Sequence, residues 1–200
     1  MSSTLFPVFL KTEKKHFLVI GGRSVAIEKV DTLLKQAGEF QITILAPSID
    51  FALQAKAMRN QNIQTIFKRY HADFLENVHF VVVATNQPGL SAQVKKEANA
   101  KNILVNAADQ PDFCDFYLGS IVNKGDLKIA ISTNGKSPIM ARRLKEYFNE
   151  VIPDEIQEVI DNLHEIRNNY QGSFHEKLRR LNEITSSLLH SEENRPPLTS

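Results

Sequence analysis

Short, mostly apolar runs alternate with amphipathic segments over the first half of the chain. The runs are typical of strands buried on both faces of a parallel sheet, and they are 17–20, 41–45, 64–67, 80–84 and 103–105. Between these runs, apolar residues recur at helical spacing. The first such segment contains Ala26, Val30, Leu33, Leu34 and Ala37, and Gly38 follows it in a position typical of a helix end. Further helices are expected over about 50–60 and up to about residue 101. Alternating strands and helices predict an α/β fold, a Rossmann-like, doubly wound parallel sheet.

The pattern changes after Asp109. Segments 117–122 and 127–132 flank the turn residues 123–126, which predicts an antiparallel pair of strands. Ser137 precedes Pro138, as is typical of an N-cap followed by proline at the first helical position. Helical spacing then resumes, at Ile156, Val159, Ile160, Leu163 and Ile166, and again at Phe174, Leu178, Leu181, Ile184 and Leu188. The last third is therefore expected to be helical, with a disordered tail at 191–200.

The turn after the first strand carries glycines typical of dinucleotide-binding folds. Gly21 and Gly22 would let the backbone approach a pyrophosphate, whose oxygens the free amides around Ser24 and Val25 would bind. Arg23 stands where the fingerprint G-x-G-x-x-G/A has its middle glycine, and its side chain could crowd the phosphates or pair with them. The segment predicts a cofactor site. The alternative is a plain strand, turn and helix of an open sheet.

Other strand ends meet at the same edge of the predicted sheet. Pro47 and Ser48 follow the second strand, Thr85 the fourth, and 106–109 the fifth. NAD enzymes commonly place an acidic residue after the second strand, but here the nearest is Asp50, a weaker candidate. Backbone groups and the Ser48 hydroxyl are expected to recognise the adenosine half. No arginine follows closely to hold a 2′-phosphate, which favours NAD over NADP.

Composition and charge argue against several classes of function. The chain has 24 basic and 23 acidic residues, which gives no electrostatic reason to expect nucleic acid as a partner. No apolar run approaches the roughly 20 residues that span a bilayer, and the first residues lack the layout of a secretory signal. A cytoplasmic protein without a membrane role is expected. The single cysteine, Cys114, excludes an internal disulfide, and the histidines show no metal-binding spacing, so no metal site is expected.

Several segments together resemble the precorrin-2 dehydrogenase family of sirohaem synthesis, over about residues 5–148. They are Leu5-Phe-Pro-Val-Phe-Leu, Val19-Ile-Gly-Gly with Val25-Ala and Lys29, Val82-Val-Ala-Thr-Asn, Leu104-Val-Asn-Ala-Ala-Asp109, and Ile129-Ala-Ile-Ser-Thr-Asn-Gly-Lys-Ser-Pro-Ile-Met-Ala-Arg-Arg143. The resemblance implies NAD-dependent oxidation of precorrin-2, a tetrapyrrole, to sirohydrochlorin, in some members combined with iron insertion. It also implies a homodimer in which the middle β segment and the helical end interlock.

The resemblance places the family's central aspartate at Asp109. A carboxylate there would accept the proton released when the substrate loses a hydride to the nicotinamide, or would orient the substrate. The alternative is that Asp109 caps the turn before Pro111. Ser132 and Thr133 match the family's small hydroxyl pair, and the residues that follow are expected to hold substrate carboxylates, namely Lys136 and Ser137. The alternative for this loop is a turn that starts a helix.

Combining the pattern with the resemblance divides the chain into four expected regions. They are an NAD-binding Rossmann-like domain (1–112), a β/α segment for dimerisation and substrate (113–148), a helical region (149–190) and the tail (191–200). Three residues depart from the family pattern, Arg23, Gly119 and Asn134, and Arg23 bears directly on the cofactor. If the Arg23 side chain fills the pyrophosphate space, the cofactor could not bind. The chain would then be a chelatase, or a non-catalytic sensor or assembly module. A third alternative is an enzyme that is both dehydrogenase and ferrochelatase. It would use the same residues, so the sequence does not separate it from a dehydrogenase alone.

Overall fold

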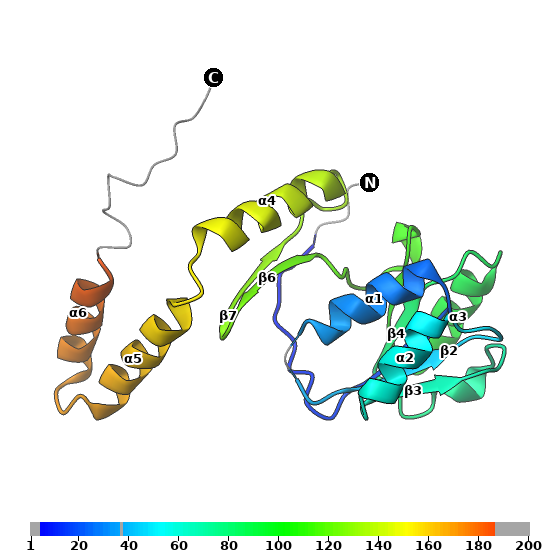
Figure 1. The fold of residues 1–200 in the computed structure, drawn as a ribbon, viewed down its shortest axis with the longest axis horizontal. Coiled ribbons are helices and arrows are strands. Elements are labelled where there is room, and N and C mark those ends of the chain that lie inside the picture. The colour runs from blue at the N-terminus through cyan, green and yellow to red at the C-terminus, as the bar shows by residue number, and fades with distance from the viewer. Residues whose placement is uncertain (1–4, 37, 187–200) are drawn as a thin grey trace, which may run out of the picture. The chain divides into compact units, whose positions relative to one another are not determined.

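A parallel sheet of five strands forms the first half of the molecule. The computed structural model describes residues 5–36 and 38–186. The strands are β1 (His16–Ile20), β2 (Gln41–Leu45), β3 (Ile63–Ile66), β4 (Phe80–Val83) and β5 (Leu104–Ala107), and all neighbouring pairs are parallel. Their order in the sheet is β3-β2-β1-β4-β5. Figure 1 shows this half of the molecule with the helices that surround the strands. The predicted doubly wound α/β fold is confirmed.

Helices cover both faces of this sheet because its strands bury side chains on both faces. Phe17 and Val19 belong to one apolar cluster and Leu18 and Ile20 to the other, as the alternation of side chains along a strand requires. The first cluster includes residues of α1 (Ser24–Leu34) and α2 (Phe51–Arg59), and the second those of α3 (Leu90–Asn99). Short 3-10 helices, η1 (Ala72–Leu75) and η2 (Pro111–Phe113), lie between the strands and after β5.

Some boundaries differ from the sequence-based expectations. β3 begins one residue earlier, and β5 extends to Ala107, so part of the expected fifth loop is strand. Helix α1 ends at Leu34, well before Gly38, while Ala37 lies outside the described residues. Gly38 instead allows a close approach to Thr12, whose Oγ1 would lie 2.8 Å from a Cβ at that position. Gly38 is exposed and does not end the helix, which stops four residues earlier.

The predicted pair of strands is present after the parallel sheet, as β6 (Ser120–Lys124) and β7 (Leu127–Ile131), joined by a two-residue turn. So short a turn makes the pair antiparallel. Its first strand was expected to start at residue 117, and that bound is wrong. Phe116 and Leu118 pack instead against the first apolar cluster of the large sheet, which keeps this segment out of the pair.

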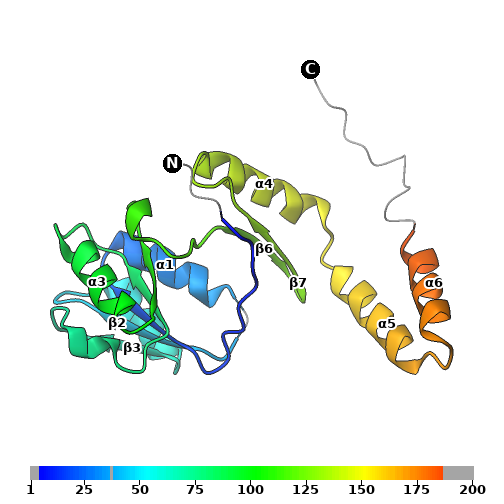
Figure 2. The ribbon, with the colours of Figure 1, turned by 180° about the vertical axis from the view of Figure 1, so that it is seen from behind.

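Three helices complete the described chain: α4 (Pro138–Val151), α5 (Ile156–Asn169) and α6 (Phe174–Thr185) (Figure 2). The predicted N-cap of α4 is present, since the Ser137 Oγ accepts a hydrogen bond from the Met140 amide at 3.2 Å. A capping box formed by Ser173 and Glu176 starts α6. The helical character of this region is confirmed, while residues 187–200, which include Leu188 and the expected tail, lie outside the described residues.

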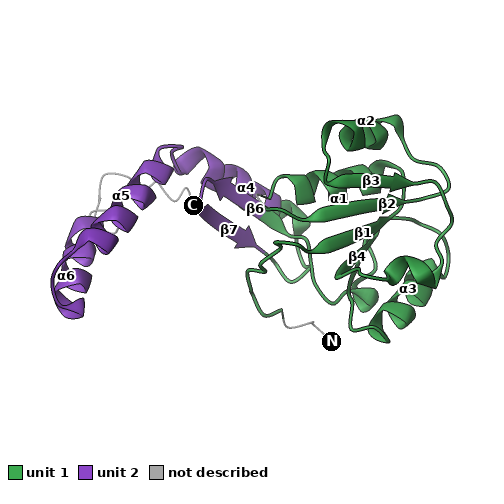
Figure 3. Cartoon of the chain, turned by 90° about the horizontal axis from the view of Figure 1, so that it is seen from below, with its two compact units in different colours: residues 1–120, 132–141 green, residues 121–131, 142–200 purple. Residues whose placement is uncertain are grey.

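The chain separates into two compact units (Figure 3). Unit 1 comprises residues 1–120 and 132–141, and unit 2 comprises residues 121–131 and 142–200. Within unit 2, Gln157 of α5 holds the turn of the hairpin, because its Oε1 accepts from the Asp126 amide at 2.6 Å. Lys124 of β6 forms an ion pair with Asp154. These contacts tie the hairpin to the start of α5.

Candidate cofactor site

A cavity of about 630 Å³ opens in unit 1 where the strands of the parallel sheet end. The turn after β1, the loops after β2, β3 and β4, and the start of α1 and α3 form its wall. The lining residues are Ile20, Gly21, Gly22, Arg23, Ser24, Val25, Ala46, Pro47, Ser48, Arg69, Tyr70, Ala84, Thr85, Asn86, Gln87 and Leu90. The chain changes direction across the sheet between β1 and β4, and ligands of such sheets bind at this reversal.

The two glycines after β1 hold three strand ends together. A Cβ at Gly21, whose φ is +145°, would lie 2.1 Å from the carbonyl oxygen of Ala84, and one at Gly22 would lie 2.1 Å from that of Ser48. The carbonyl of Gly22 also accepts from the amide of Asp50 at 2.8 Å. The sequence suggested that these glycines make room for a pyrophosphate. The structure shows that they first make room for the neighbouring backbone, which is the wall of the cavity itself.

The start of α1 offers amides suited to an anion. Arg23 is the N-cap residue in an extended conformation, and no side chain caps the helix. The amides of the first turn, at Ser24 and Val25, therefore have no side-chain acceptor at the cavity wall. The Arg23 side chain is exposed at the rim and the cavity remains open beside it. Together with an apolar floor that includes Ile20 and Ala84, this wall fits a dinucleotide.

The loops after β2 and β4 are shaped by local hydrogen bonds. Asp50, the weaker candidate for the ribose, is not in the cavity wall, because its Oδ1 accepts from the Ala52 amide at 2.8 Å and caps α2. Pro47 and Ser48 do line the cavity. Thr85 lines it too, and its Oγ1 accepts from the Gln87 amide at 3.3 Å.

Sequence reasoning missed Arg69 and Tyr70, which follow β3 and also line the cavity. The Tyr70 hydroxyl donates to Oε2 of Glu97 on α3 at 2.6 Å. Burial and this carboxylate raise the pKa of Tyr70, while the same hydrogen bond lowers the pKa of Glu97. The topology could have pointed to these two residues, because the third strand of a parallel sheet ends at the same edge as the first and second.

Asp109 lies at a different place on this edge and does not line the cavity. It follows β5, is exposed, and has a φ of +59°, in the left-handed region that aspartate and asparagine tolerate better than most residues. The neighbouring amide of Ala108 donates to the Val83 carbonyl at 2.9 Å, which fixes the turn against β4. The geometry thus agrees with a turn residue whose carboxylate faces solvent.

The four expected substrate residues gather in the loop between β7 and α4, away from the cavity lining. The Ser132 Oγ accepts from the Asn134 amide at 3.2 Å, and the Thr133 Oγ1 accepts from the Ser137 amide at 3.0 Å. Ser137 caps α4 as described above, and Lys136 is exposed. The oxygens of these hydroxyls accept from the backbone, while their O–H groups are available to donate.

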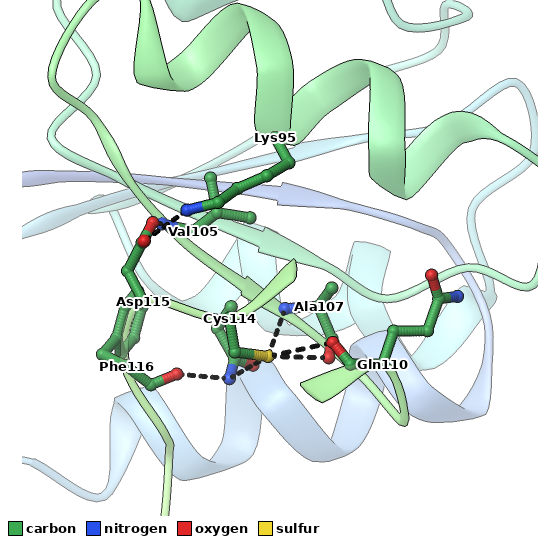
Figure 4. Close-up of polar contacts among 8 residues, drawn as sticks. Lys95, Val105, Ala107, Gln110, Cys114, Asp115 and Phe116 are labelled. Carbon is green, nitrogen blue, oxygen red and sulfur yellow. Dashed lines mark hydrogen bonds and ion pairs between the residues drawn. The ribbon is translucent and has the colours of Figure 1, made fainter. Parts of the chain in front are cut away.

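Cys114 is part of the packing beside β5 (Figure 4). Its Sγ accepts from the Ala107 amide and donates to the Ala107 carbonyl, both at 3.2 Å, and burial raises the pKa of the thiol. Next to it, the Asp115 Oδ2 accepts from the Val105 amide at 2.9 Å, and its carboxylate forms an ion pair with Lys95. A protonated, hydrogen-bonded thiol is a structural group rather than a nucleophile.

Within residues 5–36 and 38–186, no group of three or more histidine, cysteine or acidic side chains is arranged to hold a metal ion. None of the helices in this same part of the chain is long and apolar enough to cross a membrane.

Family models match most of the chain. One, described as "Putative NAD(P)-binding", matches residues 8–120, and another, "Sirohaem biosynthesis protein central", matches residues 124–147. The first covers the parallel sheet and its cavity, and the second covers the last residue of β6, all of β7 and most of α4.

Curated relatives carry names from the same biosynthesis. "Siroheme synthase" of Psychrobacter arcticus is 38% identical over 148 residues, which are 74% of this chain and 26% of the relative. "Siroheme synthase" of Pseudoalteromonas translucida is 38% identical over 151 residues, 75% of this chain and 31% of the relative. "Siroheme synthase 1" of Serratia proteamaculans is 30% identical over 177 residues, 88% of this chain and 36% of the relative. The chain therefore spans about a third of these relatives or less.

A solved structure named "SirC, precorrin-2 dehydrogenase" is similar over nearly the whole chain. The TM-score is 0.70 at 26% sequence identity, and the match covers 90% of this chain and 89% of the other. The similarity thus includes the parallel sheet, the strand pair and helices after it.

Proposed function

This chain belongs to the NAD(P)-binding family of sirohaem biosynthesis proteins, and we propose that it oxidises precorrin-2 to sirohydrochlorin with NAD⁺ as the hydride acceptor. The single observation that carries the proposal is the cavity at the switch point, whose wall combines uncapped helix amides with an apolar floor. The names of the siroheme synthases and of SirC supply the substrate class.

Each part of the cavity has a proposed role toward the dinucleotide. The amides of Ser24 and Val25 bind the pyrophosphate, and Pro47 and Ser48 contact the adenosine half. Gly21 and Gly22 hold the wall that carries these groups, Arg23 stands at its rim, and Thr85 lies on the β4 side where the nicotinamide half extends. NAD⁺ held by these residues would supply the hydride acceptor, and the chain's residues would orient the substrate toward it.

Asp109 is proposed to accept the proton that leaves as the hydride is transferred. In the described part of the chain its carboxylate is exposed and has no ion pair or side-chain hydrogen bond, so it is available as a base. The reaction balances as precorrin-2 plus NAD⁺ giving sirohydrochlorin, NADH and a proton. Ser132, Thr133, Lys136 and Ser137 are proposed to bind the substrate's carboxylates through O–H and ammonium donors.

The functional division of the chain is part of the proposal. Residues 1–112 bind the cofactor, 113–148 serve substrate binding and dimerisation, and 149–190 complete the dimer. A cytoplasmic location is included, supported by the single cysteine of the chain.

A homodimer is supported by the helices of unit 2. Neither α5 nor α6 has a buried residue in the described chain, and apolar side chains such as Phe174 (69% exposed) and Val159 (42% exposed) face solvent. A second copy would cover them. Sedimentation at micromolar concentration is expected to give twice the monomer mass, and a stable monomer would contradict this part of the proposal.

The test is incubation of the purified chain with precorrin-2 and NAD⁺ under anaerobic conditions, followed by addition of ferrous iron or cobalt. Tetrapyrrole absorbance is expected to change from that of precorrin-2 to that of sirohydrochlorin before metal is added. A change only after metal addition would indicate a chelatase instead. No change at either step, with the dinucleotide bound, would indicate a sensor or assembly module.

A further inference from the structure

Two arginines on the cavity wall have no acidic partner. Arg23 comes from the start of α1 and Arg69 from the loop after β3, and both side chains are exposed. In the described residues no carboxylate lies within ion-pair distance of either guanidinium, whereas four other arginines pair with glutamates: Arg142, Arg143, Arg179 and Arg180. The cavity wall therefore presents two uncompensated positive charges to a ligand.

No carboxylate offsets these charges in the wall. The lining residues include neither aspartate nor glutamate, and the end of β2 is Leu45, followed by Ala46, Pro47 and Ser48. Sites selective for NAD commonly place an acidic side chain there, which binds the ribose hydroxyls and repels a 2′-phosphate. Asp50 does not take that role because its carboxylate caps α2. The feature that excludes NADP is thus missing from this wall.

Arg69 is brought to the adenosine side by strand pairing. β3 lies next to β2, with Ile66 opposite Leu45, and the Ala46 amide donates to the Ile66 carbonyl at 3.2 Å. The loop that carries Arg69 therefore starts beside the loop that carries Ser48. Tyr70, the residue after Arg69, donates a hydrogen bond to Glu97 and so holds the chain against α3. The backbone that carries Arg69 is therefore held before it by the pairing of β3 with β2 and after it by Tyr70.

We propose that Arg23 and Arg69 form a subsite for the 2′-phosphate of NADP⁺, so that the cavity accepts NADP⁺ as well as NAD⁺. The inference rests on the proposed dinucleotide site. Guanidinium groups bind phosphate with two parallel N–H donors, and this geometry suits a dianionic 2′-phosphate near Ser48. The sequence-based preference for NAD over NADP depended on the lack of an arginine after β2, and strand pairing brings one there from the loop after β3.

The experiment measures dissociation constants of NAD⁺ and NADP⁺ for the purified full chain by titration calorimetry. Parallel titrations with 5′-AMP and 2′,5′-ADP isolate the contribution of the 2′-phosphate. The variants are Arg69→Gln and Arg23→Gln, and the matched control is Arg59→Gln, an exposed arginine at the end of α2 outside the cavity wall. Thermal unfolding establishes that each variant is folded.

NADP⁺ is expected to bind the unmodified chain within about tenfold of NAD⁺. Arg69→Gln is expected to raise the ratio of the NADP⁺ to the NAD⁺ dissociation constant by about tenfold, as for loss of one charge-assisted contact, while Arg59→Gln leaves the ratio unchanged. Binding of NAD⁺ without NADP⁺ would overturn the subsite and leave the proposed function standing. Equal weakening of both cofactors by Arg69→Gln would also overturn it, since the arginine would then serve a shared phosphate. Failure of both cofactors to bind would refute the proposed function itself.

Discussion

Gly22→Ala tests whether the turn after β1 requires glycine because it lies against the backbone of the loop after β2. The added Cβ would lie 2.1 Å from the Ser48 carbonyl oxygen and 3.0 Å from both Ala46 Cβ and Ile49 Cα. Ordinary contact begins at 3.4 Å, so the loop after β2 must move by about 1.3 Å, the difference between 3.4 and 2.1 Å. Such overpacking costs about 1–3 kcal/mol. Weakening the bond from the Asp50 amide to the Gly22 carbonyl adds about 1 kcal/mol.

The sum of about 2–4 kcal/mol corresponds to a fall in Tm of roughly 4–16 °C for a chain of this size. Circular dichroism measures the melting, and calorimetry is expected to show dinucleotide binding weakened by about tenfold because the wall has moved. Ser24→Ala, at an exposed position of the same turn, is the control and should change stability by no more than about 0.5 kcal/mol. A Gly22→Ala variant that melts with the unmodified chain would refute the steric argument.

Three further changes follow from the same structure. Asp109→Asn is expected to keep dinucleotide affinity but slow precorrin-2 oxidation by about a hundredfold or more, and steady-state rates at the unmodified level would exclude Asp109 as the base. Tyr70→Phe removes the hydrogen bond to Glu97 and should lower stability by about 1 kcal/mol in urea unfolding, an effect that Glu97→Ala, which removes the acceptor, should largely share. Burial lowers the pKa of His16 below its ordinary 6.5, so its contribution to stability is complete above pH 6.5 and is lost as the pH falls through the folded pKa. Urea midpoints should therefore drop less between pH 8 and pH 5 in His16→Gln than in the unmodified chain.

The fold was predictable because its signal is local. Strands such as β4 are continuous apolar runs, and the N-cap at Ser137 followed by Pro138 marks a helix start within two residues. The glycine turn was located correctly for the same reason. Its physical role was not predictable, since the contact of Gly22 with the Ser48 carbonyl joins loops that only the assembled sheet brings together.

The candidate site was predictable only in part. The residues named from the first, second and fourth loops gather in one cavity, whereas Asp109 and the Ser132 to Ser137 loop do not line it. Arg69 carries no local signal, because it is an exposed arginine in an irregular segment. Arg69 reaches the cavity because β3 pairs with β2, and the spacing of residues along the chain does not reveal which strands pair.

The proposed function depends on hydride transfer from precorrin-2 at the cavity, with Asp109 as the base. The most direct measurement is the yield of NADH and of sirohydrochlorin in the same anaerobic reaction, with purified chain in excess over precorrin-2. We expect one NADH for each sirohydrochlorin formed, and a much slower appearance of both with Asp109→Asn. Sirohydrochlorin formed without NADH, or bound NAD⁺ that yields neither product, would contradict it.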